Sequence, residues 1–225
     1  MKKIITYCLA AGLVALLGCR DESLNPVPVW ESAVHGFGVF ADVTEPAANS
    51  SARPHIANFA RNFPLISQTA TAASVNFKLR WVSLDNKLTV NKIEVYLDMV
   101  EAYTDPDGNP RTVSLGNGGR LLKTLTAAGN RQWTAFSVSP QEVFTMYKDA
   151  TVKYDRVKDV KVFENPANLR PTGAWIKSTD RLVLTWRLTT TEGLVYKTWS
   201  PDGICADPTP YSQAAANCTL VFGAR

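Results

Sequence analysis

Cys19 is the residue whose neighbours predict its chemistry most directly. Two lysines open the chain, an apolar stretch covers residues 4–17, and Gly18 lies directly before the cysteine. A basic start, a short apolar run and a small residue before a cysteine are typical of a bacterial lipoprotein signal peptide. We therefore expect residues 1–18 to be removed and the Cys19 sulfur to carry fatty acyl chains such as palmitate, which anchor a protein without spanning the membrane.

Two other interpretations of this leader are open. It could be an ordinary secretory signal in which Cys19 lies near the cleavage site by chance. A transmembrane helix fits less well, because the apolar run of 14 residues is shorter than the roughly 20 that cross a bilayer.

Residues 20–22, Arg-Asp-Glu, follow the cysteine directly. This basic-then-acidic run resembles the export signal of surface lipoproteins in the Bacteroidota, which implies the outer face of the outer membrane. An inward-facing periplasmic position is the alternative. Pro26 and Pro28 stiffen the residues that follow, so residues 19–32 are predicted to form an extended tether.

Cys205 and Cys218 are the two cysteines that remain once Cys8 leaves with the signal and Cys19 is acylated. An even pair in an oxidising compartment predicts a disulfide bond, and closing this loop would stabilise the fold by roughly 3 kcal/mol. Two free buried thiols are the alternative. A metal site is not expected at these cysteines, because neither has a histidine nearby and zinc usually takes four ligands.

Catalytic chemistry finds little support in the sequence. His35 and His55 are the only histidines, and no nucleophile motif accompanies them, so we predict no catalytic residue and no enzyme activity. A hydrolase could draw on Asp98, Glu101 and the neighbouring acids. A polar strand face and a turn explain these carboxylates better.

Asp105, Asp107 and Asn109 place a side-chain oxygen at every second residue, as a calcium-binding loop does. Two prolines among them, and the lack of a downstream glutamate, depart from the EF-hand pattern. We therefore predict no metal site and no cofactor, with calcium at residues 105–109 as the alternative.

Trp175 is the first of three aromatic residues predicted to bind a ligand. Sugar rings offer CH faces that pack on an exposed aromatic ring, while their hydroxyl groups need polar neighbours. Trp175 follows the loop-like residues 170–174, and Lys177 and Asp180 are within reach of a polar ligand.

Trp133 and Tyr211 are the other two candidates for ligand binding. Trp133 follows a polar run, and Tyr211 lies inside the loop that the two cysteines would close. For all three aromatics the alternative is a ring folded onto the core. Trp81 and Trp186 are assigned to the core, because they lie on the apolar sides of predicted strands.

Apolar and polar residues alternate along much of the chain, which predicts that β-strands position the candidate site residues. The alternation is clearest in residues 75–81, 93–99 and 182–188, and it predicts strands with one buried and one exposed face. Further strands are predicted at residues 36–43, 132–138, 154–163, 194–199 and 219–222.

Turn residues separate these strands. They lie at 105–110, 116–119 and 192–193, and they predict hairpins. Ser139 and Glu142 form a capping box, with proline at the first helical position, which predicts one short helix that runs through Tyr147.

The predicted fold is an all-β, antiparallel β-sandwich of immunoglobulin-like architecture with one short helix. Removing 18 of the 225 residues leaves 207, enough for a single domain at 33–225. The loss of two lysines with the signal lowers the formal net charge from +4 to +2, which is too small to predict a nucleic-acid partner.

The order of the predicted elements resembles that of the SusE-type and related small lipoproteins encoded beside SusC and SusD proteins in the Bacteroidota. The strands at 73–81 and 90–97, the capped turn at 139–143 and the late hairpin at 180–196 carry the resemblance. Together they cover about two thirds of the mature chain. They are patterns of a sandwich, so no binding residue is transferred with them.

The resemblance implies a lipid-anchored accessory subunit of an outer-membrane nutrient importer, with SusC/SusD-like partners and a polysaccharide or peptide ligand. Two hypotheses follow from it. A binding module is expected to present solvent-facing aromatic residues, whereas a purely structural subunit is expected to present an apolar patch that a protein partner covers.

Overall fold

The structure, a computed structural model, describes residues 33–41, 62–83, 85–197 and 219–225. The chain divides into two units, Met1–Glu31 and Ser32–Arg225, and every described residue belongs to the second. Several sequence predictions therefore lie outside the described residues. They are the signal peptide, the acylated Cys19, the tether, His55, the Cys205–Cys218 disulfide and Tyr211.

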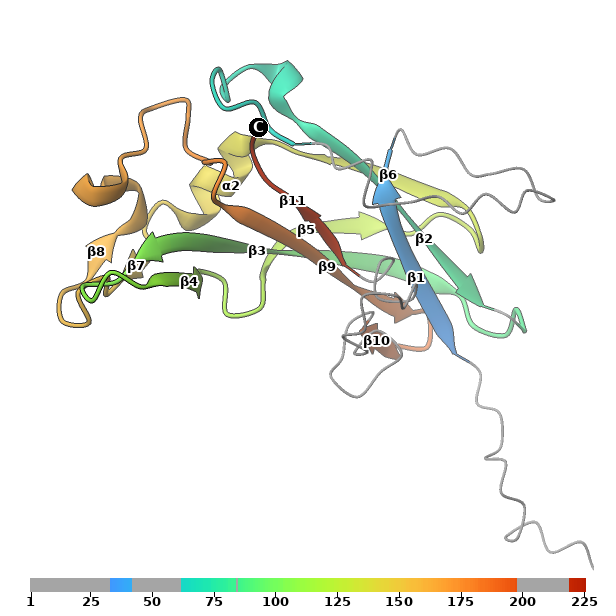
Figure 1. Cartoon of the computed structure of the whole chain (residues 1–225). Helices are drawn as coiled ribbons and strands as arrows, with labels where there is room; N and C mark the ends of the chain where they lie inside the picture. Colours follow the sequence, from blue (N-terminus) through green and yellow to red (C-terminus); the bar gives the residue numbers. More distant parts are fainter. Residues whose placement is uncertain (1–32, 42–61, 84, 198–218) are drawn as a thin grey trace, which may run out of the picture. The chain divides into compact units, whose positions relative to one another are not determined.

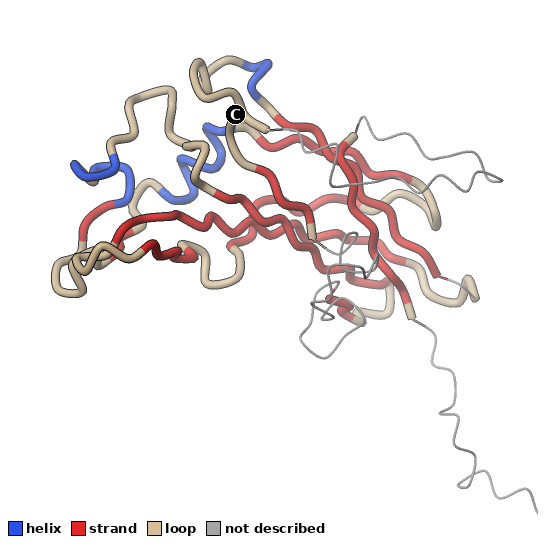
Figure 2. The backbone as a smooth tube through the Cα atoms, viewed as in Figure 1, coloured by secondary structure: helices blue, strands red, loops and turns tan. Residues whose placement is uncertain are grey.

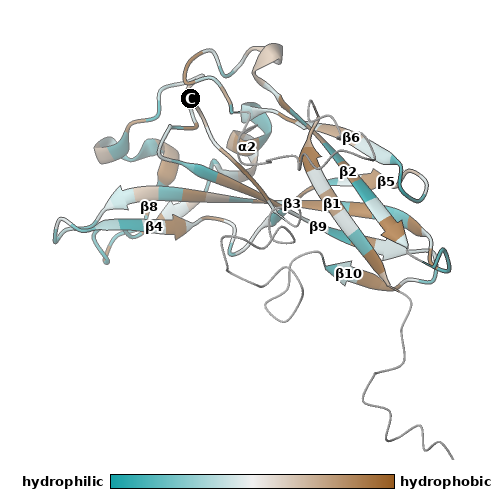
Figure 3. Ribbon diagram, turned by 45° about the vertical axis from the view of Figure 1, so that its right-hand side comes forward, coloured by the Kyte–Doolittle hydropathy of each residue, from teal (hydrophilic) through white to brown (hydrophobic). Residues whose placement is uncertain are grey.

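The first sheet has three antiparallel strands in the order β1-β2-β6. Its strands are β1 (Val34–Phe40), β2 (Val75–Ser83) and β6 (Trp133–Val138). Alternate residues of β2 are fully buried, as the period of two predicts, and Figure 3 shows the resulting alternation of apolar and polar residues along this strand. Phe77 of β2 pairs with Phe40 on one side and with Phe136 on the other.

The second sheet is built on the long central pair β3 and β9. On the outer side of β9 lie β10 and β11, and on the outer side of β3 lie β4 and β5, all antiparallel to their neighbours. The strands are β3 (Val90–Thr104), β4 (Pro110–Ser114), β5 (Arg120–Thr126), β9 (Arg181–Thr190), β10 (Val195–Lys197) and β11 (Leu220–Phe222).

The two sheets enclose one apolar core, and Figure 1 shows β1 and β2 lying across β9 and β3. Trp81 and Trp186 are both 2% exposed, as expected for core residues. Phe77 of the first sheet meets Phe222 of the second edge to face, with ring centroids 5.1 Å apart. The described part of the chain is therefore an all-β antiparallel sandwich, which confirms the predicted fold class.

One α-helix occurs among the described residues, α2 (Pro140–Tyr147), and its capping box is present as predicted. The Glu142 N–H donates to Ser139 Oγ at 3.2 Å, and the Ser139 N–H donates to Glu142 Oε2 at 2.8 Å. None of the helices in the described ranges is long and apolar enough to span a membrane.

The chain between α2 and β9 forms short elements that gather beyond the end of β3. Figure 2 shows the helical segments of this stretch near α2. The short elements between α2 and β9 are the strands β7 (Thr151–Val152) and β8 (Val160–Lys161) and the 3-10 turns η4 (Val162–Glu164) and η5 (Pro166–Asn168). A further 3-10 turn, η3 (Thr71–Ala73), precedes β2.

The predicted strand at 154–163 is wrong over most of its length. Asp155 Oδ1 accepts hydrogen bonds from the N–H groups of Val157 and Lys158, at 2.9 and 2.8 Å, and Arg156 adopts a left-handed φ of 66°. A side chain that bonds its own following backbone favours a turn over a ladder. Tyr154, just before this turn, lies against the end of β3, where its ring meets Tyr103 and its hydroxyl donates to Glu101.

Candidate functional site

A cavity of about 570 Å³ lies at the end of β3. Its walls come from five parts of the chain: the loop before β2, the last residues of β3, the turn after β7, the residues around η5, and the loop that leads into β9. The lining residues are Leu65, Ala102, Tyr103, Thr104, Tyr154, Asn165, Ala167, Asn168, Pro171, Ala174, Ile176, Lys177, Ser178 and Thr179.

Glu101 forms the anchor beneath this cavity. It is fully buried on β3, at 0% exposure, and its two carboxylate oxygens accept three side-chain hydrogen bonds. The Tyr154 hydroxyl donates to Oε2 at 2.5 Å, Asn168 Nδ2 donates to Oε1 at 2.7 Å, and the Arg170 guanidinium donates to Oε1 at 3.1 Å. Because these bonds reach the turn at Tyr154 and the segment that holds Asn168 and Arg170, one carboxylate fixes both to the sheet.

Arg170 joins Glu101 to a second buried carboxylate, Asp180. One guanidinium nitrogen donates to Asp180 Oδ1 at 2.8 Å, and the other donates to Asp180 Oδ2 and to the Trp175 carbonyl, the latter at 2.7 Å. Both ion pairs have side chains that are 0% exposed. Burial by itself lowers the pKa of Arg170, but the hydrogen bonds and charges of Asp180 and Glu101 outweigh it and raise this pKa above its usual value.

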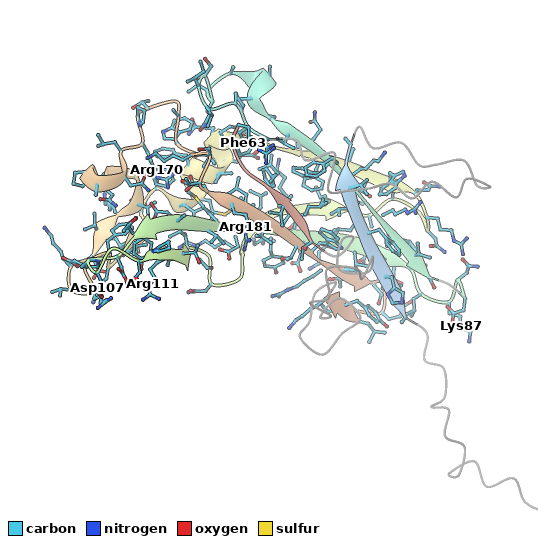
Figure 4. The ribbon with its side chains drawn as sticks, in the orientation of Figure 1. Phe63, Lys87, Asp107, Arg111, Arg170 and Arg181 are labelled. Atoms are coloured by element: carbon cyan, nitrogen blue, oxygen red, sulfur yellow. The ribbon has the colours of Figure 1, made fainter. Side chains whose placement is uncertain are left out.

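Figure 4 labels Arg170 among the side chains at this end of the molecule, with Asp107 and Arg111 nearby at the β4 edge. The guanidinium carbon of Arg170 lies 5.5 Å from the Phe163 ring centroid, so apolar surroundings complete its burial. Arg170 and its two carboxylates are thus a polar cluster within apolar surroundings. Through them, the end of β3 is joined to the loop that leads into β9.

Lys177 is the charged residue that reaches the cavity itself. Its N–H donates to Asp180 Oδ2 at 2.7 Å, and the Asp180 N–H donates back to the Lys177 carbonyl at 3.0 Å, which closes a tight turn. Its ammonium group donates to Asn168 Oδ1. Asn168 therefore has a defined orientation, because its nitrogen bonds Glu101 and its oxygen bonds Lys177.

Tyr103 and Tyr154 supply the aromatic part of the wall. Their rings meet edge to face, with centroids 5.1 Å apart and an interplanar angle of 80°. Burial and the hydrogen bond to Glu101 raise the pKa of Tyr154 well above its usual value, so its phenol stays protonated and continues to donate. Both tyrosines are partly exposed.

The opposite wall is fixed through Gln68, a fully buried amide. Gln68 Nε2 donates to the Ile176 carbonyl at 2.7 Å, and the Ile176 N–H donates to Gln68 Oε1 at 2.9 Å. This two-way pair ties the loop that carries Leu65 to the loop that carries Lys177. Apolar side chains remain exposed on these loops, with Leu65 at 46% and Leu169 at 69%.

The residues considered for calcium are held by arginines instead. Asp105 is almost fully buried, and it accepts from the Asn109 N–H at 2.8 Å, from Arg111 Nε at 3.0 Å and from Arg156 at 3.2 Å. The backbone bond from Asn109 comes first among the causes that lower the pKa of Asp105 to about 2. No group of three or more potential metal-ligating side chains occurs within the described ranges.

Trp175 lies beside the cavity, but the expectation that its ring faces solvent is wrong. The side chain is 6% exposed, and its ring stacks on Phe144 of α2 with centroids 4.7 Å apart and an interplanar angle of 17°. The short apolar run that contains it packs inward against the helix. The contribution of Trp175 to the site is its carbonyl, which Arg170 binds.

Trp133 is partly exposed on β6 and does not line the cavity. The Arg80 guanidinium lies 4.6 Å from its ring centroid and the Lys78 ammonium 5.1 Å, so two cations of β2 cover its ring. Tyr211, the third predicted aromatic, lies outside the described residues.

Asp98 and Glu101, two of the carboxylates considered for hydrolysis, are held by hydrogen bonds within the fold. Asp98 accepts from Ser114 Oγ at 2.7 Å and from the Gly116 N–H at 2.9 Å, and Glu101 is enclosed by its three donors. His35 is exposed on β1, in the other sheet.

A second, shallower hollow of about 510 Å³ opens where β3 begins and where β5 and β9 end. Threonines of β5 and β9 line it, together with Asn91, Lys92 and Gly193. Lys92 is paired with Glu94 at 3.1 Å. The hollow has no aromatic side chain in its lining, so the cavity at the end of β3 is the stronger candidate site.

Comparisons with known proteins leave the family open. No protein-family model matches this chain, and no curated protein matches it in sequence.

Proposed function

We propose that this protein is a non-catalytic binding lipoprotein whose cavity at the end of β3 captures a short glycan. The observation that carries the proposal is the composition of the wall. Two tyrosine rings meet there beside two asparagines, one lysine and hydroxyl groups. Sugar rings pack their CH faces on aromatic rings and bond their hydroxyls to amides and ammonium groups, so this wall suits a glycan.

The size and rigidity of the cavity support the same function. A volume of about 570 Å³ lies within the range typical of small-ligand pockets, roughly 300–1,000 Å³. The Glu101–Arg170–Asp180 centre and the Gln68–Ile176 pair hold its walls in place. A preformed site loses less conformational entropy when it binds.

The absence of catalysis is part of the proposal. Glycoside cleavage needs one carboxyl group that can donate a proton and a second that faces the scissile bond. Glu101 and Asp180 bond residues of the cavity wall, and both are fully buried and bound to Arg170. This arrangement supports positioning of the walls rather than hydrolysis.

The setting of the proposed function rests on the sequence. The pattern around Cys19 supports acylation and an outer-membrane anchor, and residues 20–22 support a surface-facing position. The resemblance to SusE-type lipoproteins supports SusC/SusD-like partners. Mass spectrometry of the native protein tests the anchor, since it should find Cys19 as the first residue with acyl chains attached, and an unmodified or uncleaved leader would overturn it.

A glycan array tests the binding function. The purified protein should bind a defined set of oligosaccharides, and Tyr103→Ala should weaken that binding at least about tenfold, because it removes one stacking ring. Trp133→Ala is the matched control, since Trp133 lies on the other sheet and should change binding less than about twofold. Equal losses in both variants, or no glycan binding at all, would contradict the proposal.

A structural subunit is the second candidate, and the exposed apolar side chains at the cavity favour it. Leu65, Ile66 and Leu169 are 46%, 74% and 69% exposed. Such side chains are typical of a surface that a protein partner covers. Copurification with a large membrane partner that Leu169→Asp abolishes, in a protein that binds no glycan, would favour this candidate.

A further inference from the structure

Lys177 sets the electrostatic character of the proposed glycan site. It is the single charged side chain among the 14 described residues that line the cavity. The nearby carboxylates of Glu101 and Asp180 lie beneath the wall, at 0% side-chain exposure, and Arg170 binds both. The charged group that the wall itself offers to a ligand is therefore a cation, the Lys177 ammonium.

The turn that carries Lys177 adds further donors on the same wall. Asp180 closes this turn at both ends, and the exposed Ser178 and Thr179 form its tip and line the cavity. A lysine ammonium has three donors, and Asn168 takes one of them. One ammonium and two hydroxyl groups thus lie together on three successive residues.

We propose that the ligand of this cavity is an acidic glycan, whose carboxylate or sulfate is bound by Lys177 and the hydroxyls of Ser178 and Thr179 while its sugar ring packs against Tyr103 and Tyr154. The inference rests on the proposed function, since it names the class of glycan for the same site. A charge-assisted hydrogen bond in a partly closed cavity is stronger than one between neutral groups.

Asn168 acts in this site as a positioning residue. Its amide nitrogen is fixed by Glu101, so its oxygen is aimed at the Lys177 ammonium and holds that group at the wall. The buried centre has two carboxylates and one guanidinium, and Asn168 separates the Lys177 ammonium from Glu101 by bonding both. A structural role of Lys177 and anion binding by Lys177 make different predictions. Only anion binding makes the affinity depend on the charge of the ligand.

The test is a binding series with matched pairs of probes. Oligogalacturonides, oligoglucuronides and sulfated galactans are compared with their neutral counterparts on the full, native lipoprotein. We expect at least one acidic probe to bind at least about tenfold more tightly than its neutral counterpart. Which acidic probe binds distinguishes a carboxylate from a sulfate. The affinity should also fall as salt rises from about 0.05 to 0.5 M, because salt screens the ion pair.

Three variants assign the effect to one residue. Lys177→Met should weaken binding of the acidic probe at least about tenfold, while Lys177→Arg should restore most of it. Lys87→Met is the matched control, because Lys87 is an exposed lysine that lies at the other end of the described fold in Figure 4. Thermal unfolding of Lys177→Met shows whether this variant is folded. If it is unfolded, the preference of Lys177→Arg for acidic over neutral probes is the test of the inference.

The outcomes separate this inference from the proposed function. Tight binding of neutral probes that Tyr103→Ala weakens and Lys177→Met leaves unchanged would overturn the acidic ligand and keep glycan capture. Binding of acidic probes that is equal in Lys177→Met and wild type would also overturn the inference. Failure of every neutral and acidic probe to bind would overturn both.

Discussion

Removing the guanidinium of Arg170 is the sharpest test of how this fold holds its cavity. In Arg170→Met an unbranched apolar side chain replaces the aliphatic part of arginine, and Glu101 and Asp180 lose the cation that both of them bind. Both carboxylates are at 0% side-chain exposure, so water cannot replace the lost partner without opening the structure. The substitution leaves two buried carboxylates without their cation, and these two like charges repel each other.

The expected loss of stability is large. Breaking a buried ion pair by removing one partner costs about 3–5 kcal/mol, because the other charge stays buried and unpaired. For a domain of this size each 1 kcal/mol lowers the Tm by about 2–4 °C, so Arg170→Met should lower it by about 6–20 °C. The loss is a sizeable part of the roughly 5–15 kcal/mol that stabilises a typical fold.

Thermal unfolding followed by circular dichroism measures the effect, and two further variants assign it. Arg170→Met combined with Glu101→Gln and Asp180→Asn removes the stranded charges and should regain at least half of the lost Tm. Lys161→Met removes a cation from an exposed pair with Glu164, at 3.1 Å, and should change the Tm by less than about 2 °C.

Two results would refute this reasoning. The first is a Tm of Arg170→Met within about 2 °C of wild type, which would mean that the buried centre does not hold the fold. The second is a triple variant no more stable than Arg170→Met, which would assign the loss to packing against Phe163 rather than to the unpaired carboxylates.

Three further predictions test other parts of the fold by thermal unfolding. Gly38→Ala should lower the Tm by about 2–12 °C, since a Cβ there would lie 2.5 Å from the Trp186 ring; an unchanged Tm would contradict the close packing of the sheets. Ser139→Ala removes the N-cap of α2 and should lower the Tm by about 2–4 °C, and no change would mean that the capping box adds nothing. The folded pKa of Asp105, about 2, lies below its ordinary value of 3.8, so its stabilising effect is present above that value and is lost as the pH falls through 2. Asp105→Asn should therefore lower the Tm at pH 7 by clearly more than near pH 2, where most of the effect is lost, and an equal deficit at both pH values would contradict this account.

Much of the fold could be predicted from alternation alone. Val75 to Trp81 and Leu182 to Leu188 alternate with a period of two, broken only by Val183, and these residues form central strands whose apolar faces are buried. Ser139 and Glu142 gave a local signal for α2 that depends on no distant contact. β4 and β5 were missed as strands, because both are largely exposed and lack the alternation that a buried face imposes.

The candidate site was only partly accessible from the sequence. Lys177 was noted as a residue within reach of a polar ligand, and it does line the cavity. Tyr103, Tyr154 and Asn168 were missed, since they come together only through Glu101, which lies 53 and 67 residues away from the last two. The loop-like run before Trp175 made it a candidate for ligand binding with a ring on the core as the alternative, and the stacked Phe144 ring buries it as that alternative predicts.

The central claim is that the cavity at the end of β3 holds the ligand. A crystal structure of the protein with the tightest-binding oligosaccharide from the array tests it most directly. We predict density for a sugar ring against Tyr103 and Tyr154, with an acidic group within hydrogen-bond distance of the Lys177 ammonium. Density in the shallow threonine-lined hollow or elsewhere on the surface, with the cavity at the end of β3 empty, would contradict the account.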